Sequence, residues 1–105
     1  MSSKDEGIQR LQMLEQNMQA VSMQKQQFQA QLYEVEGALK ELSSSSNAFK
    51  IVGGIMISTD KDSLSKELES KKELLEVRVQ ALEKQEKQLK ERAKSLQEEV
   101  LAGKE

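Results

Sequence analysis

The middle of the 105-residue chain reads AFKIVGGIMIST over residues 48–59. Two short runs rich in β-branched residues flank the dipeptide Gly53-Gly54, which is the pattern of a β-hairpin closed by a two-residue turn. The polar stretch SSSSN at residues 43–47 precedes it and is typical of a loop, although a serine tract can also be a modified linker. We therefore predict one β-hairpin over residues 48–59.

Outward from this hairpin, both halves of the chain carry heptad repeats. In residues 8–42, with Leu11 at position a, every a and d position is apolar except Lys25. In residues 62–102 a leucine occupies every d position from Leu68 to Leu96, while the a positions are mixed. The sequence contains no proline, so nothing interrupts a long helix. Both segments are predicted to be long coiled-coil helices.

The two helices are predicted to pair with each other. If the chain folds back at Gly53-Gly54, residues whose numbers sum to 107 face each other, so that Leu11 meets Leu96. Each a position of one helix then lies opposite a d position of the other, as an antiparallel coiled coil requires. The expected fold class is mainly α, a single domain over residues 1–105 that forms a long antiparallel coiled-coil hairpin.

Two of the charged residues in the otherwise apolar seam lie close to each other. Lys25 and Glu86 fall in adjacent layers of that seam. We predict that they form an ion pair, which fixes the register at some cost in stability. The alternative is that both side chains extend out of the seam to water.

The predicted hairpin has little to pack on within one chain. A lone two-stranded ribbon is marginal in water, and its outer edges expose unpaired N–H and C=O groups. We expect it to join hairpins of other chains in a shared sheet or intersubunit β-barrel, from which the coiled coils project with both termini at the far tips. The residues expected to form this assembly surface are Phe49, Ile51, Val52, Ile55, Met56 and Ile57.

Composition argues against several classes of function. The sequence has neither Cys nor His, which removes thiol nucleophiles, zinc–thiolate sites and the usual acid/base at neutral pH. The Gly53-Gly54 pair lacks the surrounding residues of a phosphate-binding loop. We expect no catalytic residue, no cofactor and no metal, and therefore no enzyme.

Charge and hydropathy argue against nucleic-acid and membrane partners. Lys and Arg number 16 against 18 Asp and Glu, a net charge of −2, which does not suit a grip on phosphate backbones. The regular leucines could suggest a DNA-binding zipper, but an apolar hairpin stands where the basic helix would have to be. No apolar run approaches the length of a membrane span, and residues 1–6 lack the apolar stretch of a signal peptide. A cytoplasmic protein is expected.

The hairpin and both helices resemble the β-type subunits of prefoldin. A spacer with one hairpin is typical of the β class, since the α class carries two. Phe49 stands where the family often has Tyr, and Ser58-Thr59 where a Lys commonly follows the second strand. The similar segments are Phe49-Lys50-Ile51-Val52-Gly53, Ile55-Met56-Ile57, Leu75-Glu76-Val77-Arg78, Ala81-Leu82, Gln85-Glu86-Lys87 and the Gln-rich stretch 21–27.

The resemblance implies a heterohexamer of two α-type and four β-type subunits. It also implies an ATP-independent chaperone that captures unfolded polypeptides at the coiled-coil tips and delivers them to a group II chaperonin. The acidic tip residues Glu98, Glu99 and Glu105 would then contact the chaperonin, although a solvated helix end is the ordinary role of such charges.

The client-binding tip would be formed by apolar residues near the two ends of the chain. The heptads place Ile8, Met13 and Leu101 outside the seam, where scattered surface hydrophobics are also common. A structural coiled-coil adaptor with one fixed partner and no clients remains the second hypothesis, because its seam and hairpin would look the same. The expected client-binding residues are Ile8, Leu11, Met13, Leu14, Leu96, Val100 and Leu101.

Overall fold

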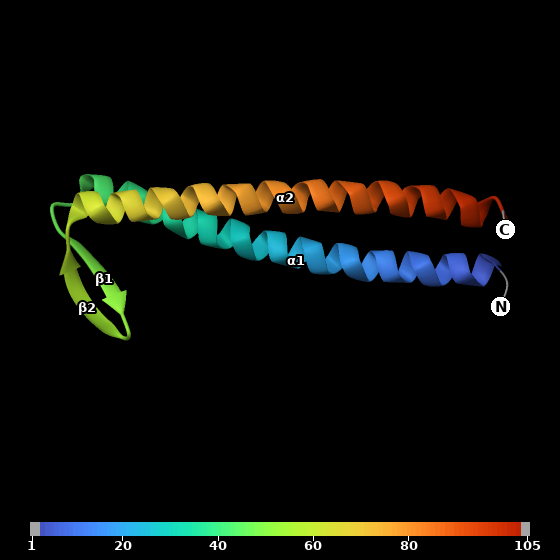
Figure 1. Cartoon of the computed structure of the whole chain (residues 1–105), viewed down its shortest axis with the longest axis horizontal. Helices are drawn as coiled ribbons and strands as arrows, with labels where there is room; N and C mark the ends of the chain where they lie inside the picture. Colours follow the sequence, from blue (N-terminus) through green and yellow to red (C-terminus); the bar gives the residue numbers. More distant parts are fainter. Residues whose placement is uncertain (1–2, 104–105) are drawn as a thin grey trace. The chain divides into compact units, whose positions relative to one another are not determined.

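The computed structural model describes residues 3–103 as two helices and a two-stranded sheet (Figure 1). The mainly α fold class, with two long helices and an antiparallel hairpin between them, is confirmed. Both helices begin before the segments expected from the heptads, and the second ends at Leu101. The elements are α1 (Ser3–Ser44), β1 (Ala48–Val52), β2 (Ile55–Thr59) and α2 (Lys61–Leu101).

The chain divides into two compact units. Unit 1 combines Met1–Gln27 with Val79–Glu105, and unit 2 is Phe28–Arg78. Unit 1 therefore pairs the first part of α1 with the last part of α2, and unit 2 holds the hairpin with the adjoining helix segments. Across residues 3–103, no helix is long and apolar enough to cross a membrane.

Burial follows the heptad pattern in each unit. The buried side chains of unit 1 include Leu14 and Val21, and those of unit 2 include Val35, Leu42 and Leu75. Val79 is buried as well, and the remaining a and d positions from Leu11 to Val100, Lys25 and Glu86 included, are half-buried. No large side chain among the described residues is fully buried. The apolar contacts are therefore confined to a narrow seam, which suits a chain with only 3% aromatic residues.

Two serine hydroxyls form hydrogen bonds with the backbone in the last turn of α1, after its last seam residue, Leu42. The Ser43 hydroxyl donates to the Lys40 carbonyl at 2.7 Å, and the Ser44 hydroxyl donates to the Glu41 carbonyl at 3.2 Å. These bonds are local side-chain contacts of the kind serine commonly makes in a helix. The stretch that was expected to be entirely loop thus starts as helix.

The turn of the hairpin has the geometry that Gly-Gly favours. Val52 pairs with Ile55, so that only Gly53 and Gly54 lie between the strands. Their φ angles are 57° and 79°. Positive φ at both central residues is the mark of a type I′ turn, whose twist matches that of the two strands. The predicted hairpin is correct in both position and length.

An aspartate cap starts α2. The Asp60 carboxylate accepts hydrogen bonds from the Ser63 backbone N–H at 3.0 Å and from the Ser63 hydroxyl at 2.9 Å. Both hydrogen bonds lower the pKa of Asp60, and the one from the backbone N–H has the larger effect. The Lys61 ammonium also donates to the Ser43 carbonyl at 3.3 Å. The start of α2 is thereby fixed beside the end of α1 in unit 2.

Candidate functional site

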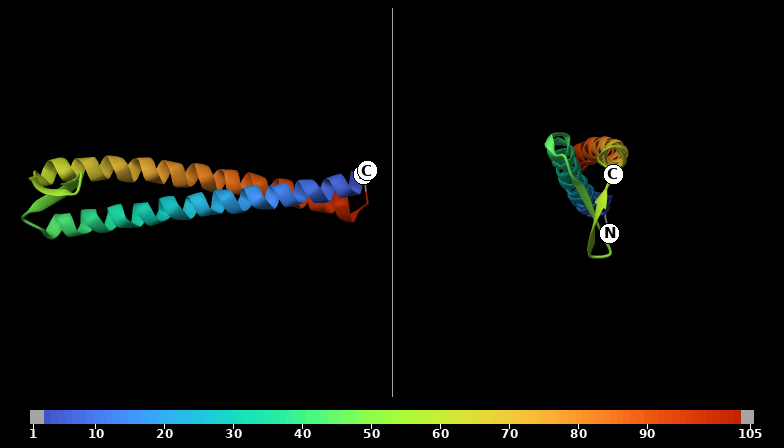
Figure 2. Two further views of the ribbon diagram at one scale, coloured as in Figure 1. Left: turned by 90° about the horizontal axis from the view of Figure 1, so that it is seen from below. Right: turned by 90° about the vertical axis from the view of Figure 1, so that its left-hand side faces the viewer.

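The six apolar residues expected to form the assembly surface are all exposed. Their exposed fractions run from 44% for Ile57 to 71% for Ile51, while only Ala48 at the start of β1 is buried. The ribbon of β1 and β2 projects from the helices of unit 2, as the right-hand view shows (Figure 2). In the described part of the chain, no third strand pairs with either edge. The hairpin therefore offers both apolar side chains and free backbone hydrogen-bonding groups.

One ion pair ties the hairpin to the first turns of α2. The Lys50 ammonium on β1 forms an ion pair with the Glu67 carboxylate at 3.3 Å. Beside this contact lies a surface groove of about 390 Å³, lined by Leu42, Phe49 and Leu68 among others. The ribbon is thus tied to α2 at the middle of β1, while its apolar side chains stay exposed.

We call the end of unit 1 formed by residues 3–14 and 92–103 the tip. Gly7 is buried there, although neighbouring helix positions are exposed. A Cβ atom placed on Gly7 would lie 2.6 Å from Cγ2 of Val100. The two helices therefore come close at this point because residue 7 has no side chain. Gly7 was missed in the sequence, yet it occupies the d position one heptad before Leu14, opposite Val100.

The structure places the expected tip residues in two groups. Ile8, Met13 and Leu101 are exposed, with exposed fractions of 41%, 63% and 79%. Leu14 is buried, and the remaining three, Leu11, Leu96 and Val100, are half-buried in the seam. Only the first group presents apolar surface that the helix pair does not use itself.

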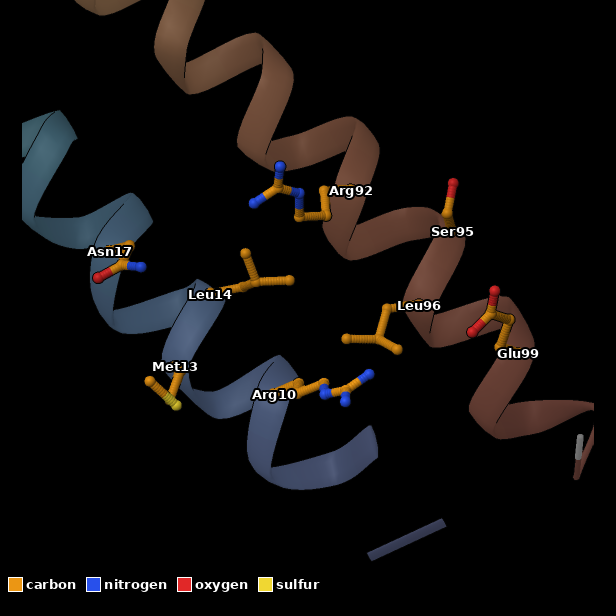
Figure 3. A pocket seen from close by; sticks show the side chains of 8 residues that line it. All are labelled: Arg10, Met13, Leu14, Asn17, Arg92, Ser95, Leu96 and Glu99. Atoms are coloured by element: carbon orange, nitrogen blue, oxygen red, sulfur yellow. The ribbon is translucent and has the colours of Figure 1, made fainter. Parts of the chain in front are cut away.

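A groove of about 410 Å³ runs between the helices at the tip. Figure 3 shows Leu14 and Leu96 pointing toward one another and the side chains of Arg10 and Arg92 reaching into the space between the helices. Met13 and Glu99 lie on its rim, with Asn17 and Ser95 completing the lining. Within residues 3–103, neither arginine forms an ion pair.

The acidic residues expected to contact a chaperonin lie at the same end. Glu98 and Glu99 are exposed on the last turns of α2. Glu105 lies outside the described residues. The pair at 98 and 99 thus leaves two carboxylates accessible beside the groove.

The predicted ion pair in the seam is confirmed. The Lys25 ammonium lies 2.9 Å from the Glu86 carboxylate, and the two side chains are 21% and 16% exposed. The hydrogen bond from Lys25 lowers the pKa of Glu86, against the opposing effect of desolvation. Both charges thus stay within the seam of unit 1 and satisfy each other.

The described residues show neither a metal-binding cluster nor an unpaired buried polar atom. Residues 3–103 contain no group of three or more His, Cys, Asp or Glu side chains placed to hold a metal ion. Every buried side-chain nitrogen or oxygen in this range has a hydrogen-bond partner.

The heptad seam, the two long helices and the exposed hairpin define a coiled-coil hairpin protein. The family model described as "Prefoldin subunit" matches residues 5–102. The chain therefore belongs to the prefoldin family.

Individual relatives agree on the β type. The chain is 39% identical over 70 residues to prefoldin subunit beta of Caldivirga maquilingensis, covering 64% of this chain and 58% of the relative. It is also 39% identical over 69 residues to prefoldin subunit beta of Archaeoglobus fulgidus, covering 63% of this chain and 60% of that one. The matched part thus spans a little more than half the length of these relatives.

A solved structure matches the whole fold. The prefoldin beta subunit from Thermococcus strain KS-1 superposes with a TM-score of 0.92 at 36% identity, covering 98% of this chain and 93% of the other. The resemblance to β-type prefoldin subunits seen in the hairpin and helices is confirmed.

Proposed function

We propose that the chain is an ATP-independent holdase subunit that captures unfolded polypeptides at its tip and passes them to a group II chaperonin. The observation that supports this most directly is the exposure of Ile8, Met13 and Leu101, which the seam leaves unused. Unfolded chains expose apolar side chains, and burying these against the tip lowers the free energy of the pair. Flexible Met and Leu side chains adapt to many partners.

The hairpin is the assembly surface of this proposal. Its apolar residues and free strand edges fit a shared β-barrel in a heterohexamer of two α-type and four β-type subunits. Pairing of edges satisfies the exposed N–H and C=O groups, and the apolar faces are buried together. Glu98, Glu99 and Glu105 are proposed to meet basic groups on the chaperonin, an attraction that added salt weakens.

Serine substitutions at the tip test the holdase role. The triple variant I8S/M13S/L101S removes apolar surface without touching the seam or hairpin, so the complex should still assemble. We expect client affinity to fall by about tenfold, because each exposed apolar group contributes a fraction of a full side-chain burial. Suppression of aggregation of a denatured client, titrated with the assembled complex, measures the loss.

A matched variant controls for general loss of surface hydrophobicity. Met23, Leu74 and Val77 are exposed by 62%, 53% and 62% and lie outside the tip and the hairpin. The variant M23S/L74S/V77S should hold clients as the parent does. If the tip variant also holds clients like the parent, the client site is elsewhere. A complex that suppresses no client and carries one fixed companion in native mass spectrometry would instead support the adaptor hypothesis.

A further inference from the structure

The groove at the tip combines apolar and cationic groups. Leu14 and Leu96 face each other across it, and Arg10 and Arg92 reach into the space between the helices (Figure 3). Neither guanidinium is engaged in an ion pair with any residue from 3 to 103. A guanidinium presents a planar set of donors that matches a carboxylate with two parallel hydrogen bonds. The groove therefore has unused donors directly beside an apolar surface.

We propose that this groove selects client segments in which a large apolar side chain lies next to an Asp or Glu. The inference rests on the proposed role of the tip as the client site and specifies the class of segment it prefers. The apolar side chain would contact Leu96 and the thioether of Met13, and the neighbouring carboxylate would accept hydrogen bonds from Arg10 or Arg92. A Lys or Arg in the same place meets like charge, so the preference has a repulsive component as well.

Glu99 limits the strength of this selection. It lies on the rim of the same groove and repels an incoming carboxylate. Charge pairs at partly exposed positions are also modest in strength. We therefore expect a preference of about fivefold for an acidic over a basic segment. Replacement of the rim carboxylate in E99Q should increase this ratio.

Two peptides that differ only in charge test the proposal. Each is unstructured, amidated at its C-terminus and labelled, with leucines flanked by Asp in one and by Lys in the other. Amidation ensures that any carboxylate effect comes from side chains. Fluorescence anisotropy with the assembled complex gives both affinities, at low salt and at about 0.5 M salt, where screening should reduce the ratio.

Matched charge variants locate the effect. The variant R10Q/R92Q should bring the two affinities to within about twofold of each other, since glutamine keeps polarity but not charge. The control K71Q/K84Q removes two cations from exposed positions of α2 that do not line the groove. It should keep the parent's ratio, because those charges are screened from the groove by solvent.

The outcomes separate this inference from the proposed function. Equal affinity for both peptides, or an unchanged ratio in R10Q/R92Q, overturns the selection for acidic segments. If the tip variant I8S/M13S/L101S then loses both peptides equally, the tip remains a client site that reads apolar groups alone. Failure of the parent complex to bind either peptide overturns both ideas. A ratio that falls in R10Q/R92Q and rises in E99Q supports the selection.

Discussion

The hairpin and the tip expose apolar side chains to a similar extent but present very different backbones. Ile51 on the hairpin is 71% exposed and Leu101 at the tip is 79% exposed. The hairpin carries its side chains on strands whose outer edges are unpaired within the described chain. The tip carries them on helices, whose backbone groups are largely bonded internally. A partner for the hairpin must therefore supply strand geometry, whereas a partner for the tip needs only suitable side chains.

Charge on the hairpin should give the largest effect. In I55D/I57D two aspartates would enter the proposed interface, where burial without partners is costly, so assembly should weaken by at least about a hundredfold. Native mass spectrometry and gel filtration measure this, with circular dichroism to verify that the helices persist. M23D places the same chemistry on an exposed helix position of unit 1 and should leave assembly intact. Normal assembly of I55D/I57D would show that the hairpin is not the assembly surface.

The ion pair in the seam should give the next largest effect. K25L leaves the Glu86 carboxylate half-buried without its partner, so the melting temperature should fall by roughly 5 °C or more. In K25L/E86L an apolar pair fills the seam, and stability should recover to the parent's value or exceed it. Thermal melts at one fixed protein concentration measure both, with K84L as an exposed control. A K25L melt identical to the parent's would show that the pair contributes nothing to the stability of unit 1.

A smaller, local effect is expected at the close approach in the tip. G7A gains helix propensity of about 0.5–1 kcal/mol but places its Cβ against Val100, so the overall melting temperature should change by less than about 2 °C. Amide hydrogen exchange over residues 96–101 should nevertheless become faster, because the helices must move apart. G7A/V100A removes the opposing methyl groups and should restore slower exchange. Unchanged exchange in G7A would mean that the tip adjusts without opening.

The smallest effect expected is on the pH dependence of stability. The pKa values of Asp60 and Glu86 are lowered from 3.8 and 4.5, so both carboxylates favour the folded state when ionised. Their contribution is complete above those ordinary values and is lost as the pH falls through the lower folded values. The loss of these two contributions should therefore lower the melting temperature by about 1 °C between about pH 5 and pH 3.

Two isosteric variants assign this pH dependence to the two units. D60N in unit 2 keeps a side chain that can cap α2 but removes the titrating carboxylate. E86Q in unit 1 keeps the shape of the seam side chain and likewise removes its carboxylate. Each variant should show a shallower decline than the parent over that range. A decline as steep in both variants as in the parent would assign the acid sensitivity to other carboxylates.

Much of the fold could be predicted from the sequence because two strong local signals agree. The heptads specify which residues enter the seam, and Gly53-Gly54 specifies where the chain turns, so the ion pair between Lys25 and Glu86 followed from counting. The ends of the helices were less accessible to this reasoning. The helical turn at Ser43 and Ser44 includes hydroxyl bonds to nearby carbonyls, which a hydropathy pattern does not report.

The candidate sites were accessible only in part. Exposure of Ile8, Met13 and Leu101 follows from their heptad positions, since none of them is an a or d residue. The close approach at Gly7 was not predicted, because a glycine adds nothing to an apolar pattern. Its d position, one heptad before Leu14, would have indicated that it lies in the seam. The cationic lining of the groove was also missed, because the convergence of Arg10 with Arg92 requires the pairing of two helices at a specific height.

The position of the Gly-Gly turn has a consequence for how this chain can change length. In unit 1, Gly7 faces Val100, and Lys25 reaches Glu86 in the adjacent layer, so the pairing of residues depends on equal numbers of residues on the two sides of the turn. A single residue inserted in one arm would shift every partner beyond it by one position and put polar groups into the seam. Seven residues inserted in one helix would keep its apolar a and d positions in line, but would shift them by one heptad relative to their partners on the other helix. Viable length variants of such a chain should therefore gain or lose whole heptads in matched pairs, one in each arm.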